Sequence, residues 1–126
     1  MVSYKNYVDK EELISRGYDL MADGVLDDTH FTSRDEAADD FMQNCFNQVT
    51  GLITKYRGRT WTNAFLTDMQ QSDLTGRAKE FQVAFHDAIL EQCIYTYDCG
   101  DASASAYKGE SQYAPKAVEL LWGLVI

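Results

Sequence analysis

Apolar side chains recur every three or four residues from about Ser33 to Tyr56, and this stripe constrains the fold more than any other feature. Such spacing places the side chains on one face of an α-helix, whose period is about 3.6 residues. Ser33 and Glu36 fit the S-x-x-E capping box that begins many helices, and Gly58 suits the position just after a helix end. The sequence predicts a long amphipathic helix with apolar residues at Ala38, Phe41, Met42, Cys45, Val49, Leu52, Ile53 and Tyr56.

The charges at the two ends of this segment support the same prediction. Acidic side chains are favoured at the positive beginning of a helix macrodipole, and basic side chains are favoured at its negative end. The acidic residues are Asp35, Glu36, Asp39 and Asp40, and the basic residues are Lys55, Arg57 and Arg59.

A second long segment, from about Leu74 to Asp98, is apolar on two sides. A helix with two apolar faces is usually surrounded by other elements, so we expect the central helix here, with Gly100 as its stop. One face carries Phe81, Phe85, Ala88 and Ile89, and the other carries Val83, Leu90, Ile94 and Tyr97.

Three shorter segments complete the predicted helices. They span about Lys10 to Met21, Trp61 to Met69 and Pro115 to Trp122, and proline is well placed in a first helical turn. There is no alternating strand pattern of useful length and no internal repeat. The sequence therefore predicts an all-α fold, a small bundle of about four to five helices with a long central helix and a mobile loop before the last one.

All 126 residues are assigned to a single domain. Its parts are an arm and first helix (1–32), core helices (33–98), a loop of small and polar residues (99–113), and a last helix with its tail (114–126).

The balance of charge limits the partners. Asp and Glu outnumber Lys and Arg by 20 to 11, for a net charge of −9, which disfavours nucleic-acid binding through a basic patch. The negative charge does not exclude a channel wall past which DNA slides. Such a wall does not bind the DNA, because no counterions are released by the contact. No run approaches the roughly 18 apolar residues that a membrane span requires.

Cysteine usage and the N-terminus indicate a compartment. Cys45, Cys93 and Cys99 form no C-x-x-C pair, so we expect reduced thiols in a cytoplasmic protein. The first residues, Met-Val-Ser-Tyr-Lys-Asn-Tyr, lack the apolar stretch of a signal peptide.

The residues that could carry chemistry favour no reaction. His30 lies near Asp27 and Asp28, and His86 shares a helix with Asp87 and Glu91, but neither spacing matches a known metal motif. Glycine-rich phosphate loops and the Gly-x-Ser-x-Gly motif are absent. We therefore expect no enzyme, and no catalytic, cofactor-binding or metal-binding residues.

An interface is the better candidate for a functional site. Tyrosines in the loop and an apolar chain end are typical of protein contacts, although half-buried tyrosines are an ordinary alternative. The groove that takes the chain end could lie in its own domain or in a neighbouring subunit, and we expect deletion of residues 121–126 to impair assembly more than helicity. The candidate interface residues are Tyr107, Tyr113, Leu121, Trp122, Leu124, Val125 and Ile126.

Three segments in order carry a family resemblance: VTGLITKYRGR (49–59), AILEQCIYTY (88–97) and APKAVELLWGL (114–124). With the small-residue loop before the last one, they resemble the head-to-tail connector, or adaptor, proteins of tailed bacteriophages. The likeness covers roughly residues 35 to 124 through short motifs of common residues. The part before Ser33 does not match the family, and the chain ends soon after Gly123-Leu124, where many members continue.

The resemblance implies a non-enzymatic virion protein, present in the host cytoplasm during assembly. Its copies would form a homo-oligomeric ring, often of twelve, beneath the portal protein. The ring would extend the DNA channel without binding DNA specifically and would receive a stopper or tail-completion protein. The alternative, from another class, is a small acidic helical regulator or inhibitor that binds one host protein.

Overall fold

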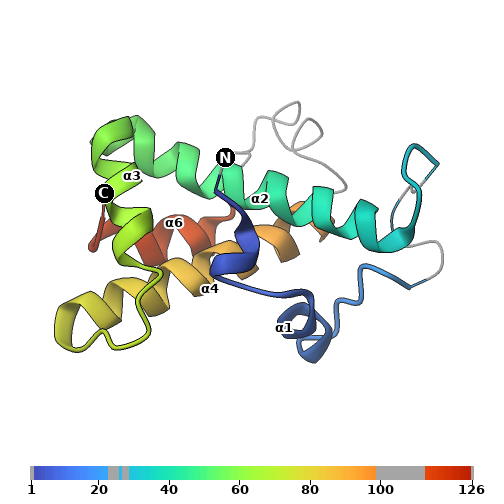
Figure 1. Ribbon diagram of the computed structural model, residues 1–126, viewed down its shortest axis with the longest axis horizontal. Coiled ribbons are helices and arrows are strands. Elements are labelled where there is room, and N and C mark those ends of the chain that lie inside the picture. Colours follow the sequence, from blue (N-terminus) through green and yellow to red (C-terminus); the bar gives the residue numbers. More distant parts are fainter. Residues whose placement is uncertain (1, 23–25, 27–28, 99–112, 126) are drawn as a thin grey trace.

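The computed structural model describes residues 2–22, 26, 29–98 and 113–125, and it confirms the all-α fold. Among these residues there are five α-helices and one 3₁₀ turn, without a strand (Figure 1). The elements are η1 (Tyr4–Asn6), α1 (Lys10–Ser15), α2 (Arg34–Arg57), α3 (Arg59–Asp68), α4 (Gly76–Asp98) and α6 (Pro115–Trp122).

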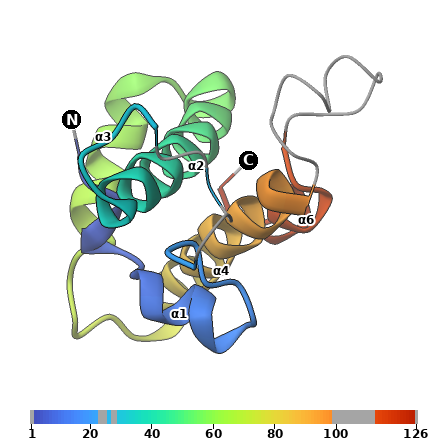
Figure 2. The same ribbon diagram turned by 90° about the vertical axis from the view of Figure 1, so that its right-hand side faces the viewer.

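Helix α4 is the central element, as its two apolar faces predict. It packs against α2, α6 and α1, and Figure 2 shows α2 and α6 on opposite sides of it. Ile89 and Leu90, neighbours in sequence that point to different sides, are both buried. One core results, because the apolar stripes of α2 and α6 are covered by the same helix.

Helix α2 begins and ends where the sequence predicts. The Ser33 side chain caps it by accepting a hydrogen bond from the Glu36 amide at 3.1 Å. The reciprocal half of the capping box is replaced, because the Glu36 carboxylate accepts instead from the Thr32 hydroxyl at 2.5 Å. The buried face of α2 consists of Ala37, Ala38, Met42, Cys45, Phe46, Val49, Leu52 and Ile53.

The first helix is shorter than predicted. Helix α1 ends at Ser15 rather than near Met21, because Gly17 adopts a φ of +91° and the Tyr18 amide bonds back to the Leu13 carbonyl at 2.9 Å. This is a Schellman-type helix end, in which glycine adopts the positive φ with little steric strain. A full capping box joins Asp9 and Glu12 at its beginning.

Gly58 is the only residue between α2 and α3, and it caps both helices. Its φ of 85° and ψ of 161° lie in a region that is essentially restricted to glycine. A Cβ at this position would meet no neighbouring atom within 4 Å, so strain and not crowding would limit a substitution.

We therefore expect Gly58→Ala to lower the free energy of unfolding by about 1–3 kcal/mol, measured by urea denaturation. Gly51→Ala is the matched control, since Gly51 is an exposed helical glycine with open space around it. That control should be neutral or slightly stabilising, by up to about 1 kcal/mol. Equal effects of the two substitutions would contradict a special role for the Gly58 torsions.

Candidate interaction site

The ends of α2 and α6, far apart in sequence, meet at one end of the molecule. The Tyr56 and Trp122 rings pack edge to face, with centroids 6.0 Å apart and an interplanar angle of 82°. The Arg57 side chain donates from Nε to the backbone oxygen of Val125 at 2.7 Å. These contacts fix the tail of the chain against the last turn of α2.

Tyr56 and Trp122 are also the two most exposed large apolar side chains among the described residues, at 49% and 58%. Trp61 continues this surface onto α3, where it stacks on Phe65 with centroids 5.3 Å apart. The Arg57 guanidinium lies 5.1 Å from the centre of the Trp61 ring. Exposed aromatic rings with arginine beside them are the residue types that interface hot spots favour.

The structure separates the predicted interface residues into two groups. Leu121 and Val125 are buried in the chain's own core at 1% exposure each, so they are not surface contacts. Trp122 is exposed, and Tyr113 and Leu124 are half-buried. Tyr107 and Ile126, like most of the loop assigned to 99–113, lie outside the described residues.

Because Leu121 and Val125 are buried, the groove that takes them lies within the same domain. Deletion of 121–126 would remove core residues and destabilise the bundle. We therefore expect such a deletion to lower helicity as well as assembly. A test of this surface needs single substitutions at exposed positions such as Trp122.

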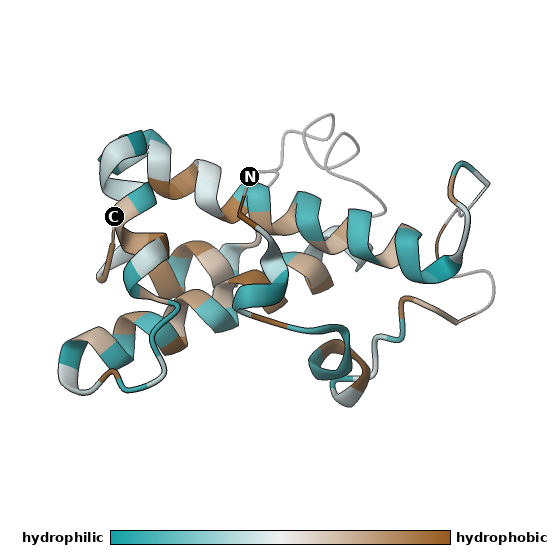
Figure 3. Cartoon of the chain, viewed as in Figure 1, coloured by the Kyte–Doolittle hydropathy of each residue, from teal (hydrophilic) through white to brown (hydrophobic). Residues whose placement is uncertain are grey.

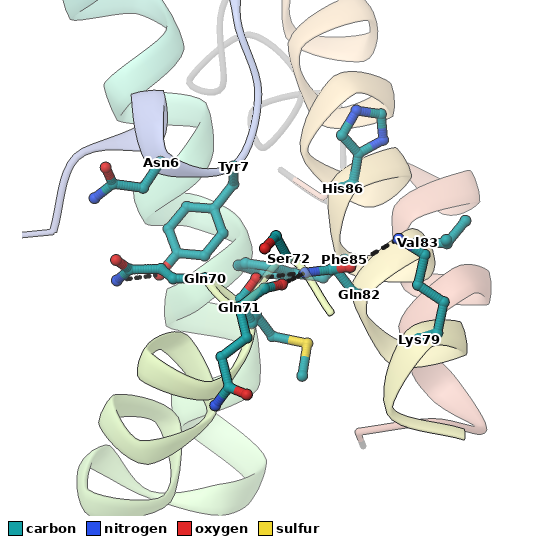
Figure 4. A pocket seen from close by; sticks show the side chains of 11 residues that line it. Asn6, Tyr7, Gln70, Gln71, Ser72, Lys79, Gln82, Val83, Phe85 and His86 are labelled. Carbon is teal, nitrogen blue, oxygen red and sulfur yellow. Dashed lines mark hydrogen bonds between the residues drawn. The ribbon is translucent and has the colours of Figure 1, made fainter. Parts of the chain in front are cut away.

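A second candidate is a cavity of about 400 Å³ between the N-terminal arm, the α3–α4 connection and α4 (Figure 4). Most of the polar side chains that line it form hydrogen bonds with other residues of the protein. The Tyr7 hydroxyl donates to the Leu66 carbonyl at 2.6 Å and accepts from Gln70 at 3.1 Å. Gln82 donates from Nε2 to the carbonyl oxygens of Met69 and Gln71, at 2.8 and 2.7 Å. These bonds give the pocket a structural use and leave few of its polar groups for a ligand.

His86 borders this cavity and belongs to a charged cluster between α1 and α4. Its Nε2 contacts the Glu12 carboxylate, and its Nδ1 lies 2.9 Å from Asp87 Oδ1. Arg16 pairs with Glu91 at 3.3 Å and with Asp87 at 3.9 Å. Sequence spacing grouped His86, Asp87 and Glu91 but gave no sign of the α1 partners, which only the tertiary fold brings close. The cluster fastens α1 to α4, which supports the expectation of an ordinary histidine.

The N-terminal arm is attached to α2 by a similar cluster. Lys10 bonds the carboxylates of Asp35 and Asp39 at 2.5 and 2.8 Å, and the buried Tyr4 hydroxyl donates to Asp39. Burial would raise the pKa of the Asp39 carboxyl, but hydrogen bonds from Lys10 and Tyr4 outweigh it, and the pKa lies below its ordinary value. Burial and the Asp39 carboxylate raise the pKa of Tyr4. The arm is thus part of the folded bundle.

The structure also describes two of the three cysteines, together with His30. Cys45 and Cys93 are free, buried thiols, as expected. A hydrogen bond with Cys45, together with burial, raises the pKa of Cys93 well above its ordinary value, which keeps the thiol protonated. His30 is exposed before α2, while Cys99, Asp27 and Asp28 lie outside the described residues.

Among the residues that the structure describes, no group of three or more His, Cys, Asp or Glu side chains is arranged to hold a metal ion. None of the helices within these residues combines the length and apolar character needed to cross a bilayer.

Comparison of the chain with protein-family models, curated proteins and solved structures found no match.

Proposed function

We propose that this chain is a structural subunit of the head-to-tail connector of a tailed bacteriophage. In this role it would form a ring beneath the portal, extend the DNA channel and present a surface to the stopper or tail. It would act by assembly and not by catalysis, in the virion and, before that, in the host cytoplasm.

One observation carries the proposal further than the sequence likeness alone. The first and last of the three family-like segments, 49–59 and 114–124, are joined at one end of the bundle by the Tyr56–Trp122 and Arg57–Val125 contacts. The middle segment, 88–97, lies in α4, which packs against both α2 and α6. Segments that resemble one family therefore belong to one structural unit, and that unit ends in an exposed aromatic surface.

The decisive experiment mixes purified protein with the portal protein encoded by the same genome, and measures association by light scattering and analytical ultracentrifugation. We expect a complex larger than the portal alone at micromolar concentrations. Absence of association under these conditions would contradict the proposal.

Trp122 offers a sharper version of the same experiment. Because its ring is mostly exposed, Trp122→Ala should change the melting temperature by only a few degrees while weakening portal association about tenfold or more. Val83→Ala is the matched control, since Val83 is an exposed apolar residue on α4. If both variants bind the portal like the unmodified protein, the Tyr56–Trp122 surface is not needed for assembly on the portal.

Mass spectrometry of purified phage particles separates this role from that of a small acidic regulator. A connector subunit is expected in particles in a fixed ratio to the portal protein. A regulator should instead be absent from particles and form a soluble one-to-one complex with a host protein.

A further inference from the structure

The charges of α2 are segregated along the molecule. Residues 41–67 contain no Asp or Glu, and their charged residues are Lys55, Arg57 and Arg59. All three are exposed, and no carboxylate of the described chain forms an ion pair with them. In a protein with a net charge of −9, the last turn of α2 and the start of α3 are thus locally basic and lie at the same end as Tyr56 and Trp122, where α6 contributes one exposed carboxylate, Glu119.

The beginning of α2 has the opposite character. Glu36 and Asp40 are exposed, one helical turn apart, and bond only neutral groups, the Thr32 hydroxyl and the Asn44 amide. Asp35 pairs with Lys10 and keeps 60% of its side chain exposed. Half-buried Phe41 follows directly and offers apolar area beside the carboxylates.

The two ends cannot reach each other within one molecule. Helix α2 has 24 residues and so spans about 36 Å, and it runs along the long axis of the bundle (Figure 1). Figure 3 shows a largely hydrophilic start of α2 and a mixture of hydrophilic and intermediate residues at its other end. The Tyr56–Trp122 pair lies at that second end. Two different complementary surfaces at opposite ends of a rigid body fit a head-to-tail contact, which closes into a ring or continues as a filament.

We propose that the basic aromatic end of one copy, formed by Lys55, Tyr56, Arg59 and Trp122, docks on the acidic start of α2 in a second copy, formed by Glu36 and Asp40. The proposal rests on the connector function and names the contact between its subunits. Glu36 and Asp40 share a helix face and meet Lys55 and Arg59, while the aromatic rings cover Phe41. At physiological salt the electrostatic screening length is about 8 Å. The repulsion between the distant charges of two acidic copies is therefore largely screened, while the attraction between opposite charges in direct contact remains.

The test uses charge reversal at each end of the full chain. The variant Lys55→Glu/Arg59→Glu removes the basic surface, and Glu36→Lys/Asp40→Lys removes the acidic one. Sedimentation velocity at about 0.15 M salt should show oligomers for the unmodified chain. The self-association of each variant should be weaker by about tenfold or more. The variant Lys79→Glu/Lys116→Glu is the control, since it makes the same charge change at exposed lysines of α4 and α6.

Mixing the two variants gives the strongest discrimination. Each variant carries like charges at both ends, so neither should self-associate alone. Their mixture should form oligomers in which the two variants alternate, and combining all four reversals in one chain should restore oligomers for the same reason. Circular dichroism of each variant verifies the fold. A monomeric unmodified chain up to about 200 µM, unaffected assembly in either variant, or no association between the two variants in the mixture would overturn the contact.

These outcomes are distinct from those that test the connector function. Portal binding that is unaffected by both charge reversals, with no self-association, would retain the function and remove this contact. Salt-sensitive oligomers that never bind a portal would retain the contact and remove the function.

Discussion

Replacing Phe85 with alanine is expected to cost about 3–5 kcal/mol of unfolding free energy, much of the roughly 5–15 kcal/mol available to a domain of this size. Phe85 is 1% exposed on α4, and its ring contacts those of Tyr7, Phe46 and Phe65 at centroid distances of 5.3, 6.1 and 5.2 Å. These partners come from the N-terminal arm, α2 and α3. Removal of one ring would therefore leave a cavity where four parts of the chain meet.

Urea denaturation followed by circular dichroism measures this loss. Phe81→Ala is the matched control, because Phe81 lies one turn earlier on α4 and is only half-buried. Phe85→Leu should recover part of the loss, since it refills much of the volume but none of the ring contacts. If Phe85→Ala were no more destabilising than Phe81→Ala, the aromatic cluster would not be the centre of the core.

Replacing Gln92 with alanine is expected to have the next largest effect, about 2–4 kcal/mol. Gln92 is completely buried on α4. Its Oε1 accepts from the Ala114 amide at 2.7 Å, and its Nε2 donates to Gln48 at 3.0 Å and Thr96 at 3.1 Å. Ala114 is the N-cap of α6, which has no side-chain cap of its own, and Gln92 accepts from the N-cap amide in the way that the N3 Glu or Gln of a capping box does, but from another helix.

Two companion variants separate volume from hydrogen bonding. Gln92→Met keeps the length of the side chain but leaves the buried Ala114 amide without this acceptor, so it should retain most of the loss. Gln48→Ala removes one bond and keeps the Ala114 bond, so it should cost about 1 kcal/mol. Hydrogen exchange should show faster exchange in α6 for the Gln92 variants only, and uniform exchange changes across all helices would argue against a local anchor.

Local sequence signals predicted the helices well and their contacts poorly. The stripe from Ser33 to Tyr56 and Pro115 in a first helical turn placed α2 and α6 almost to the residue, because periodicity and caps depend on neighbours in sequence. The first helix was predicted too long because Tyr18 and Met21 continue its apolar spacing beyond Gly17, whose left-handed torsions end it. The Asp9-x-x-Glu12 capping box was a usable signal for its beginning.

The candidate site was harder to predict for a physical reason. Periodicity shows which side of a helix is apolar, but not which helix covers it. The burial of Leu121 and the exposure of Trp122, adjacent residues in an apolar run, are decided by the position of α4. Gln92 could have been noticed as a polar residue within an apolar stretch, but its bond to Ala114 spans 22 positions and has no local signature.

Gly58 alone connects α2 and α3, so no loop separates these two helices of the core. A loop of several residues can absorb an added or lost residue, but here the change would pass directly into α3. One residue inserted before Trp61 would rotate the rest of α3 by about 100° about its axis, since each helical residue contributes that angle. Leu66 would then take the exposed position of Thr67 and Phe65 the position of Leu66, so both would lose their present core contacts. The length of this junction is therefore as tightly constrained as any buried side chain.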